Sequence, residues 1–384
     1  MVLATFRATL RALYVYSAII AVAGSVLYSV FAPYAKSVGI GPFEYGILTA
    51  ILTLVGMLSA PIWGYLSDKV DPRLLLAIAS FTGSSIFLFL LIKAKWAYYM
   101  AAMMAGVTVG SSAVSQGLVG KLAEDKDKGF AYLQFSNLIG GALGALLVLT
   151  GLFSNYNQAF AFGAMVMIFS LAPLAFMKRV SFKVSMPKLS ELKALPRAVY
   201  YIFAFQLILA IGAAAGVWMI DYYFVKKYNV GMRSVGLYVF LRQTSIALMT
   251  LLVPDLSKRE GRLKAYFLLA IPATVLTFMV TLVNDFYLAL ALIIARGALI
   301  NAGNPIIDAI LADFTPKEIM GTVMGILTTL NAMGATLGRL IGGYLMEIDV
   351  ELPLRFTALM YALGIGELGL TIGRRSKART SEVR

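Results

Sequence analysis

Twelve apolar runs, each long enough to cross a lipid bilayer, constrain this chain more than any other feature of its sequence. A helix needs about 20 apolar residues to cross a bilayer. In the first half of the chain the runs are 12–35, 43–65, 74–92, 96–120, 130–153 and 158–177; in the second half they are 198–224, 232–253, 264–283, 286–311, 320–346 and 354–373. Because backbone polar groups must be satisfied internally in lipid, each run is predicted to be helical. We expect an all-α integral membrane protein with twelve transmembrane helices.

The composition argues against an ordinary soluble enzyme. Hydrophobic residues make up 60% of the chain and charged residues only 14%, whereas a soluble protein is about a quarter charged. Cysteine and histidine are both absent, which removes the thiolate and imidazole groups of most catalytic and metal sites. No nucleotide-binding GxxxxGK[ST] loop occurs. We therefore expect no metal and no cofactor, and we disfavour an intramembrane enzyme, an ATP-driven pump and a channel.

The net charge of +14 is distributed as short basic clusters between the apolar runs. That pattern is typical of cytoplasmic loops and not of a nucleic-acid-binding face. When both tails and the even-numbered loops are placed on one side, that side holds 23 of the 33 Lys and Arg residues and the other side holds 7. The positive-inside rule then predicts a multi-pass protein of the cell membrane with both termini in the cytoplasm.

A basic stretch at residues 178–197 divides the chain nearly in half, and the two halves repeat. The pair Leu-Ser at 66–67 recurs at 256–257, and the segment NLIGGALG at 137–144 matches NAMGATLG at 331–338. Similar offsets in corresponding runs indicate a parallel internal repeat. We predict a six-helix bundle over 1–177, a cytoplasmic linker over 178–197, a second six-helix bundle over 198–373 and a basic cytoplasmic tail over 374–384.

The loop between the second and third runs reads GYLSDKVDPR over residues 64–73. It resembles the signature loop of the major facilitator superfamily, in which a glycine precedes an Asp and a basic residue, with further basic residues after them. Gly64, Asp68, Lys69 and Arg73 match this pattern, whereas the DP pair at 71–72 departs from it. The twelve runs, the repeat and the basic linker are similar to that family across nearly the whole chain. The resemblance implies a secondary transporter that works by alternating access.

By the same resemblance, Asp68 holds the two halves closed on the cytoplasmic side through the N-terminus of the eleventh helix. A carboxylate at a helix N-terminus is favoured by the helix dipole. The second copy of the loop keeps Gly261 and Arg262 but has Lys258 where the Asp would be. We therefore expect only the first copy to perform the role of the Asp, and the further gating candidates are Gly64, Lys69, Arg73, Gly261 and Arg262. The alternative is a solvated turn with positive-inside charges.

Three arginines lie inside apolar runs of the second half, namely Arg242, Arg296 and Arg339. A charge within the membrane is costly and is a functional candidate by default. Because guanidinium groups bind carboxylates and phosphates bidentately, converging arginines indicate an anionic substrate. No Asp or Glu occurs in the run that holds Arg242. The alternative is that one or more of these arginines form structural ion pairs with Asp308 or Glu367.

Polar side chains at helical spacing accompany these arginines and also occur in the first and seventh runs. The predicted substrate-binding residues are Arg242, Tyr238, Arg296, Arg339, Asn301, Asn304, Asn331, Tyr28 and Gln206. With no histidine to titrate, proton coupling requires a carboxylate, and the candidates are Asp308, then Asp221 and Glu367. Interhelical hydrogen bonding is the alternative role of the uncharged residues.

The function predicted from the sequence is secondary active transport of a small solute, an organic anion, across the bilayer. The alternative is a proton-coupled drug or sugar efflux transporter, because the apolar walls are rich in aromatic and Met residues. The expected partners are the lipid bilayer, a small-molecule substrate and protons or another coupling ion, with the chain acting as a monomer. No nucleic-acid partner is expected.

Overall fold

The computed structural model describes residues 2–177, 196–250, 253–315 and 320–373, and every regular element in these ranges is a helix. The predicted linker lies outside the described residues except for its last two positions, and the predicted basic tail at 374–384 lies outside them entirely. The all-α membrane fold is confirmed. Nine helical segments of the described ranges are long and apolar enough to cross a membrane, so the count of twelve stays a prediction.

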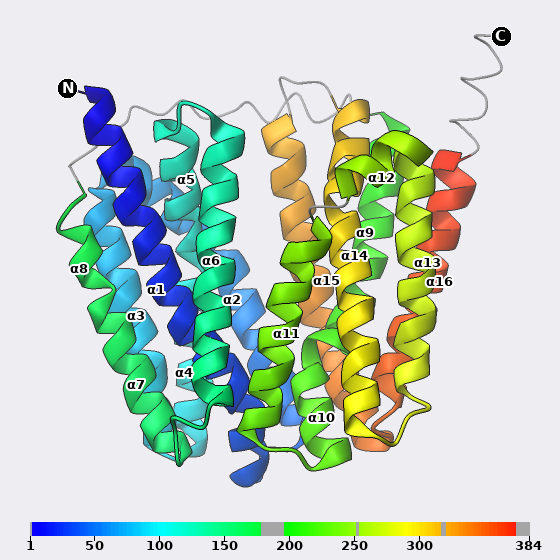
Figure 1. Cartoon of the computed structure of the whole chain (residues 1–384), viewed down its shortest axis with the longest axis horizontal. Coiled ribbons are helices and arrows are strands. Elements are labelled where there is room, and N and C mark those ends of the chain that lie inside the picture. Colours follow the sequence, from blue (N-terminus) through cyan, green and yellow to red (C-terminus); the bar gives the residue numbers. More distant parts are fainter. Residues whose placement is uncertain (1, 178–195, 251–252, 316–319, 374–384) are drawn as a thin grey trace. The chain divides into compact units, whose positions relative to one another are not determined.

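The described residues of the first half of the chain form eight helices (Figure 1). They are α1 (Val2–Ser37), α2 (Pro42–Lys69), α3 (Pro72–Leu91), α4 (Lys95–Gly110), α5 (Ser112–Leu122), α6 (Lys126–Leu149), α7 (Tyr156–Phe169) and α8 (Leu171–Leu174). Side chains cap several of them: Asp71 accepts a hydrogen bond from the Arg73 amide at the start of α3, and Asn155 accepts one from the Gln158 amide at the start of α7. Such caps satisfy amides that have no partner within the helix.

Within residues 196–250, 253–315 and 320–373, the second half contains eight α-helices and two shorter helical turns. They are α9 (Arg197–Ala215), η2 (Val217–Met219), α10 (Ile220–Tyr228), α11 (Met232–Thr250), α12 (Val253–Glu260), α13 (Arg262–Val280), α14 (Phe286–Phe314), α15 (Met320–Ile348), α16 (Leu352–Leu368) and η4 (Gly369–Gly373).

Three predicted runs are interrupted in the structure. The run 96–120 divides at Ser111 into α4 and α5, the run 158–177 divides at Ser170 into α7 and α8, and the run 198–224 divides at Gly216. The hydroxyls of Ser111 and Ser170 each donate a hydrogen bond of 2.6 Å to a carbonyl three residues earlier. Such back-bonding competes with the helical ladder and bends helices.

The described residues form two compact units, and their boundary does not coincide with the midpoint of the sequence. The first unit comprises Met1–Ser185 together with Asn229–Thr244, and the second comprises Met186–Tyr228 together with Ser245–Arg384. The first part of α11 therefore packs with the first half of the chain. Each unit has its own buried apolar core, one built on α1, α3 and α5 and the other on α9, α13, α14 and α16.

Glycines allow the closest helix packing within each unit. In the first unit, Gly140 and Gly144 of α6 lie against the carbonyl groups of Ala18 and Val22 in α1, where a Cβ atom would have no room. Small residues at four-residue spacing let membrane helices approach this closely. The result is a closely packed α1–α6 pair, and both helices contribute to the candidate site.

Candidate substrate site

Arg242 of α11 lies close to Tyr28 of α1 within the first unit. The guanidinium carbon is 6.0 Å from the centroid of the Tyr28 ring, a distance at which the ring face attracts a cation. Both side chains are half-buried, whereas Tyr238, one turn earlier on the same face of α11, is only 2% exposed. The structure thus brings together two predicted substrate-binding residues from opposite halves of the sequence.

Two further polar side chains lie beside this pair. A Cβ atom on Gly141 of α6 would be 3.0 Å from Nε2 of Gln243 and 3.1 Å from Oγ of Ser25. Polar side chains from α1 and α11 therefore converge on the face of α6 at this glycine. Our sequence analysis missed Gln243 and Ser25. Both could have been found from their positions next to predicted site residues. Gln243 directly follows Arg242, and Ser25 precedes Tyr28 by about one helical turn.

The contact of α11 with α6 continues away from this cluster. A Cβ atom on Gly236 would be 3.2 Å from both the Ala145 carbonyl oxygen and the Leu149 amide nitrogen, so the two backbones are in near contact. One turn earlier, the Arg233 guanidinium lies over Gly151, whose φ of +79° favours glycine. These contacts hold the first part of α11 on α6 and fix the position of Arg242.

Arg296 lies within the second unit, between α13, α14 and α16. It is 3% exposed. Its Nε donates to the Thr277 hydroxyl over 3.3 Å, its Nη2 donates to the Tyr361 hydroxyl, and its guanidinium carbon is 5.2 Å from the centroid of the Tyr361 ring. No carboxylate of the described residues forms an ion pair with it. Neutral groups of the protein engage this buried cation, so it is a structural tie between three helices.

Asn301, Asn304 and Asp308 lie at helical spacing on α14 and form a polar stripe. The described hydrogen bonds of Arg296 go to other residues, so the stripe does not reach it. Asn301 donates its side-chain amide to the Gly297 carbonyl of its own helix over 2.7 Å. Asn304 and Asp308 are exposed. The stripe therefore exists as a face of α14, and its two last members remain available to solvent or solute.

Arg339 lies on α15 in the second unit, with its guanidinium carbon 5.6 Å from the centroid of the Trp218 ring. Asn331, two turns earlier on that helix, has a buried Oδ1 with no hydrogen-bond partner among the described residues. Gln206 is half-buried on α9, which packs along α15. These three predicted residues lie on neighbouring helices of one unit.

The two remaining proton-coupling candidates occupy different settings in the second unit. Asp221 of α10 is 1% exposed and accepts a hydrogen bond from the Tyr222 amide over 2.9 Å. Glu367 of α16 is half-buried, and its Oε2 has no hydrogen-bond partner in the part of the chain that the structure describes.

The signature loop is ordered around Arg73. Its guanidinium forms an ion pair of 2.6 Å with Asp71 and donates to the Met177 carbonyl over 3.1 Å, which ties the loop to the segment after α8. Asp71, which departs from the family pattern, therefore anchors the loop. Lys69 bonds to the hydroxyl of a tyrosine one turn earlier. The side chain of Asp68 lies outside what the structure describes, so its gating role stays a prediction.

The second copy of the loop forms its own contacts. Gly261 has a φ of +78°, which favours glycine at the turn between α12 and α13. Arg262 forms an ion pair with Asp313 near the end of α14. Gly64 of the first copy faces open space and is followed one turn later by a serine that donates to its carbonyl.

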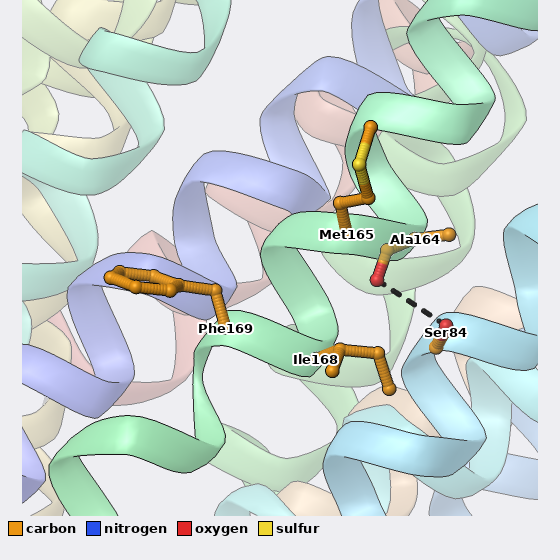
Figure 2. Close-up of a pocket in the computed structure, with 5 residues that line it drawn as sticks. All are labelled: Ser84, Ala164, Met165, Ile168 and Phe169. Carbon is orange, nitrogen blue, oxygen red and sulfur yellow. Dashed lines mark hydrogen bonds between the residues drawn. The ribbon is translucent and has the colours of Figure 1, made fainter.

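A groove of about 400 Å³ between α3 and α7 is lined by none of the predicted residues. Figure 2 shows its five lining residues, Ser84, Ala164, Met165, Ile168 and Phe169, with one hydrogen bond of 3.3 Å from the Ser84 hydroxyl to the Ala164 carbonyl. Met165 and Phe169 are 64% and 65% exposed. None of the five lining residues is charged, and most are apolar. Such a groove suits lipid chains and has no charged group that could bind a polar solute.

The chain belongs to the Major Facilitator Superfamily, whose model matches residues 13–283 and again 202–383. It is similar to the uncharacterized MFS-type transporter MJ1317 of Methanocaldococcus jannaschii, with 23% identity over 348 residues that cover 84% of this chain and 85% of the relative. The family resemblance predicted from the sequence is confirmed. The protein is a membrane transporter and not an enzyme.

Solved transporter structures share the fold at low sequence identity. The nucleoside transporter NupG aligns with a TM-score of 0.76 and 14% identity over 94% of this chain and 98% of its own. The human organic anion transporter MFSD10 aligns with a TM-score of 0.65 and 15% identity over 94% and 99%. A bacterial homologue of the iron transporter ferroportin, in an inward-facing state, aligns with a TM-score of 0.72 and 13% identity over 94% of this chain and 97% of its own. These neighbours handle different solutes, so the fold alone does not select a substrate.

Proposed function

We propose that this transporter moves a small organic anion, with Arg242 and Tyr28 at the centre of its binding site. The observation that carries the proposal is the 6.0 Å approach of the Arg242 guanidinium to the Tyr28 ring. An arginine is always charged and presents a fork that matches a carboxylate, while the tyrosine ring offers an apolar face. A carboxylate joined to a flat apolar body suits both groups.

The uncharged neighbours support the same assignment. Gln243 and Ser25 lie beside Gly141 and can donate hydrogen bonds to a bound anion without adding charge. The absence of any Asp or Glu from residues 232–253 leaves α11 with arginines as its only charges. A cationic substrate would meet repulsion here, which makes drug cations poorer candidates than carboxylates.

A thermal-unfolding screen of the purified protein tests the proposal. Benzoate, benzamide and benzylamine have similar size and shape but differ in charge, and glucose represents sugars. Ligands that bind only the folded state raise its stability, by about 2.7 kcal/mol at a hundredfold excess over Kd. We expect benzoate to raise the midpoint of unfolding more than the other three. Stabilisation by benzylamine or glucose and not by benzoate overturns the anion proposal in favour of the drug or sugar alternative.

The transport cycle we propose is alternating access in a monomer, with protons or another ion as the coupling species. Saturable, gradient-dependent uptake of benzoate into proteoliposomes is the expected result, whereas linear uptake indicates a channel. Both termini are proposed to face the cytoplasm, and the residues proposed to gate that side are Gly64, Asp68, Lys69, Arg73, Gly261 and Arg262. An Asp68→Asn variant that inserts normally is expected to transport more slowly than wild type.

A further inference from the structure

The short helix α12 differs from the spanning helices around it. It connects α11 to α13, and the turn at Gly261, with its φ of +78°, makes α12 lie across the end of α13 (Figure 1). Leu256 of α12 packs against the buried core of the second unit. Lys258 and Arg259, on the last turn, are exposed. Helix α12 is thus docked on the protein through Leu256, and its last turn exposes two basic side chains; the side chain of Asp255 lies outside what the structure describes.

Four basic side chains occur from residue 258 to residue 264, and two of them have acidic partners among the described residues. Arg262 pairs with Asp313, and Lys264 pairs with Glu260. Lys258 and Arg259 pair with no carboxylate in the part of the chain that the structure describes. The last turn of α12 therefore carries two positive charges that no carboxylate of the described residues neutralises.

The level of α12 along the bilayer normal follows from its neighbours. The spanning segment of α13 begins at Arg262, two residues after α12 ends, and the spanning segment of α14 ends at Leu311, two residues before the partner of Arg262. Helix α12 thus lies where two membrane spans end, in the region of the lipid headgroups. An amphipathic helix in that region presents its basic residues to anionic lipids.

We propose that Lys258 and Arg259 bind the phosphate of an anionic phospholipid headgroup, such as that of phosphatidylglycerol. The guanidinium of Arg259 can hold two phosphate oxygens, and the ammonium of Lys258 adds a compact charge beside it. Lys258 occupies the repeat position of Asp68, so the two signature loops carry opposite charges at this position. In the second copy, the acidic group comes from the bilayer.

The test compares unfolding midpoints of the full-length protein in nanodiscs of phosphatidylcholine alone and of phosphatidylcholine mixed equally with phosphatidylglycerol. We expect phosphatidylglycerol to raise the midpoint of wild type, and the Lys258→Gln/Arg259→Gln variant to lose most of that rise. The Lys258→Arg/Arg259→Lys variant keeps both charges and is expected to keep the rise. Native mass spectrometry is expected to show fewer retained phosphatidylglycerol molecules on the glutamine variant.

A matched control removes the same charge from the same segment. The Arg262→Gln/Lys264→Gln variant loses two cations that already have acidic partners, so its midpoint is expected to fall equally in both lipid mixtures while the rise persists. An equal loss of the rise in both glutamine variants means that net charge alone matters and overturns the proposed site, as does a full rise in Lys258→Gln/Arg259→Gln. Reproduction of the rise by soluble glycerol phosphate in phosphatidylcholine discs overturns the assignment to a lipid.

Discussion

Gly342 of α15 lies against the carbonyl oxygen of Ala215 in α9, with no space between the two helices for a side chain. One turn earlier, Gly338 lies in the same way against Ile211. Close backbone approach at small residues is a principal source of attraction between membrane helices, because the lipid tails are as apolar as the helix surfaces. The α9–α15 pair is therefore built on glycine, as the α1–α6 pair is in the first unit.

Replacing Gly342 by alanine is expected to destabilise the protein. The added methyl group would overlap the Ala215 carbonyl, and overpacking of this kind costs about 1–3 kcal/mol. Gly325, on the same helix, has no atom within 4 Å of the position of a Cβ, so Gly325→Ala is the matched control and should be neutral or slightly stabilising. Thermal unfolding in detergent compares the two variants. Equal midpoints for both would contradict the packing argument.

The hydroxyl of Tyr361 is expected to stabilise the second unit through the buried Arg296. Tyr361→Phe keeps the ring but leaves one guanidinium donor without its acceptor, which costs about 1–3 kcal/mol for a buried donor. Tyr287 is 70% exposed on α14, and Tyr287→Phe serves as the control that should unfold at the wild-type midpoint. Because Arg296 is 3% exposed, benzoate affinity should not change in Tyr361→Phe. A Tyr361→Phe variant as stable as wild type would remove the structural role that we assign to Arg296.

The membrane helices were predictable because hydropathy is a local property of the sequence. Their interruptions were not, since Ser111, Ser170 and Gly216 have residue types that also occur within unbroken helices. The repeat was recognised at an offset of 194 residues, which aligns Gly144 with Gly338. In the packing, however, Gly144 faces Val22 while Gly338 faces Ile211. The two contacted residues of α1 and α9 are thus separated by 189 positions and not 194, so the offset differs between the two helices of each pair, which no local pattern could indicate.

The individual residues of the candidate site could be predicted from the sequence, but their proximity in space could not. Arg242 is conspicuous because a charge within an apolar run is rare, and Tyr28 lies on a recognisable polar face. Their proximity depends on the first part of α11 packing with the first unit, which is a tertiary property. The same limit applies to Arg296. We predicted substrate contact, with an acidic partner as the alternative, whereas in the structure two neutral hydroxyls accept hydrogen bonds from its guanidinium.

Asp308 is expected to carry proton coupling. Asp308 is exposed on α14, one helical turn after Asn304, where protons can reach it. The protein contains no histidine that could titrate instead. Asp308→Asn should abolish accumulation of benzoate driven by a pH gradient while exchange of benzoate across proteoliposomes continues. The control is Asp285→Asn at the other end of α14, where the exposed carboxylate accepts a hydrogen bond from the Leu288 amide; this variant should accumulate benzoate as wild type does. Full pH-driven accumulation by the Asp308→Asn variant excludes this residue.

Arg242 is expected to bind the substrate and to select for negative charge. Arg242→Lys keeps the charge but loses the bidentate fork and the broad contact with the Tyr28 ring, so benzoate affinity should fall by about tenfold, which corresponds to about 1.4 kcal/mol. Arg242→Ala removes the charge as well and should weaken binding further. Isothermal titration with benzoate and benzamide measures both effects, and the preference for the anion over the neutral amide should disappear in Arg242→Ala.

A matched arginine distinguishes substrate binding from helix packing. Arg233 lies on the same helix but packs over Gly151, at the end of α6, so Arg233→Lys should leave the affinity for benzoate and the preference over benzamide unchanged. If Arg242 acts only in packing, both of its variants will lose folded protein while the remaining folded fraction binds benzoate normally. A stable Arg242→Ala variant with wild-type affinity for benzoate, or a substrate that proves to be cationic, contradicts the assignment. In the first case the binding site must be sought among the polar residues of the second unit, beginning with Arg339 and Asn331, and in the second the drug alternative replaces the anion.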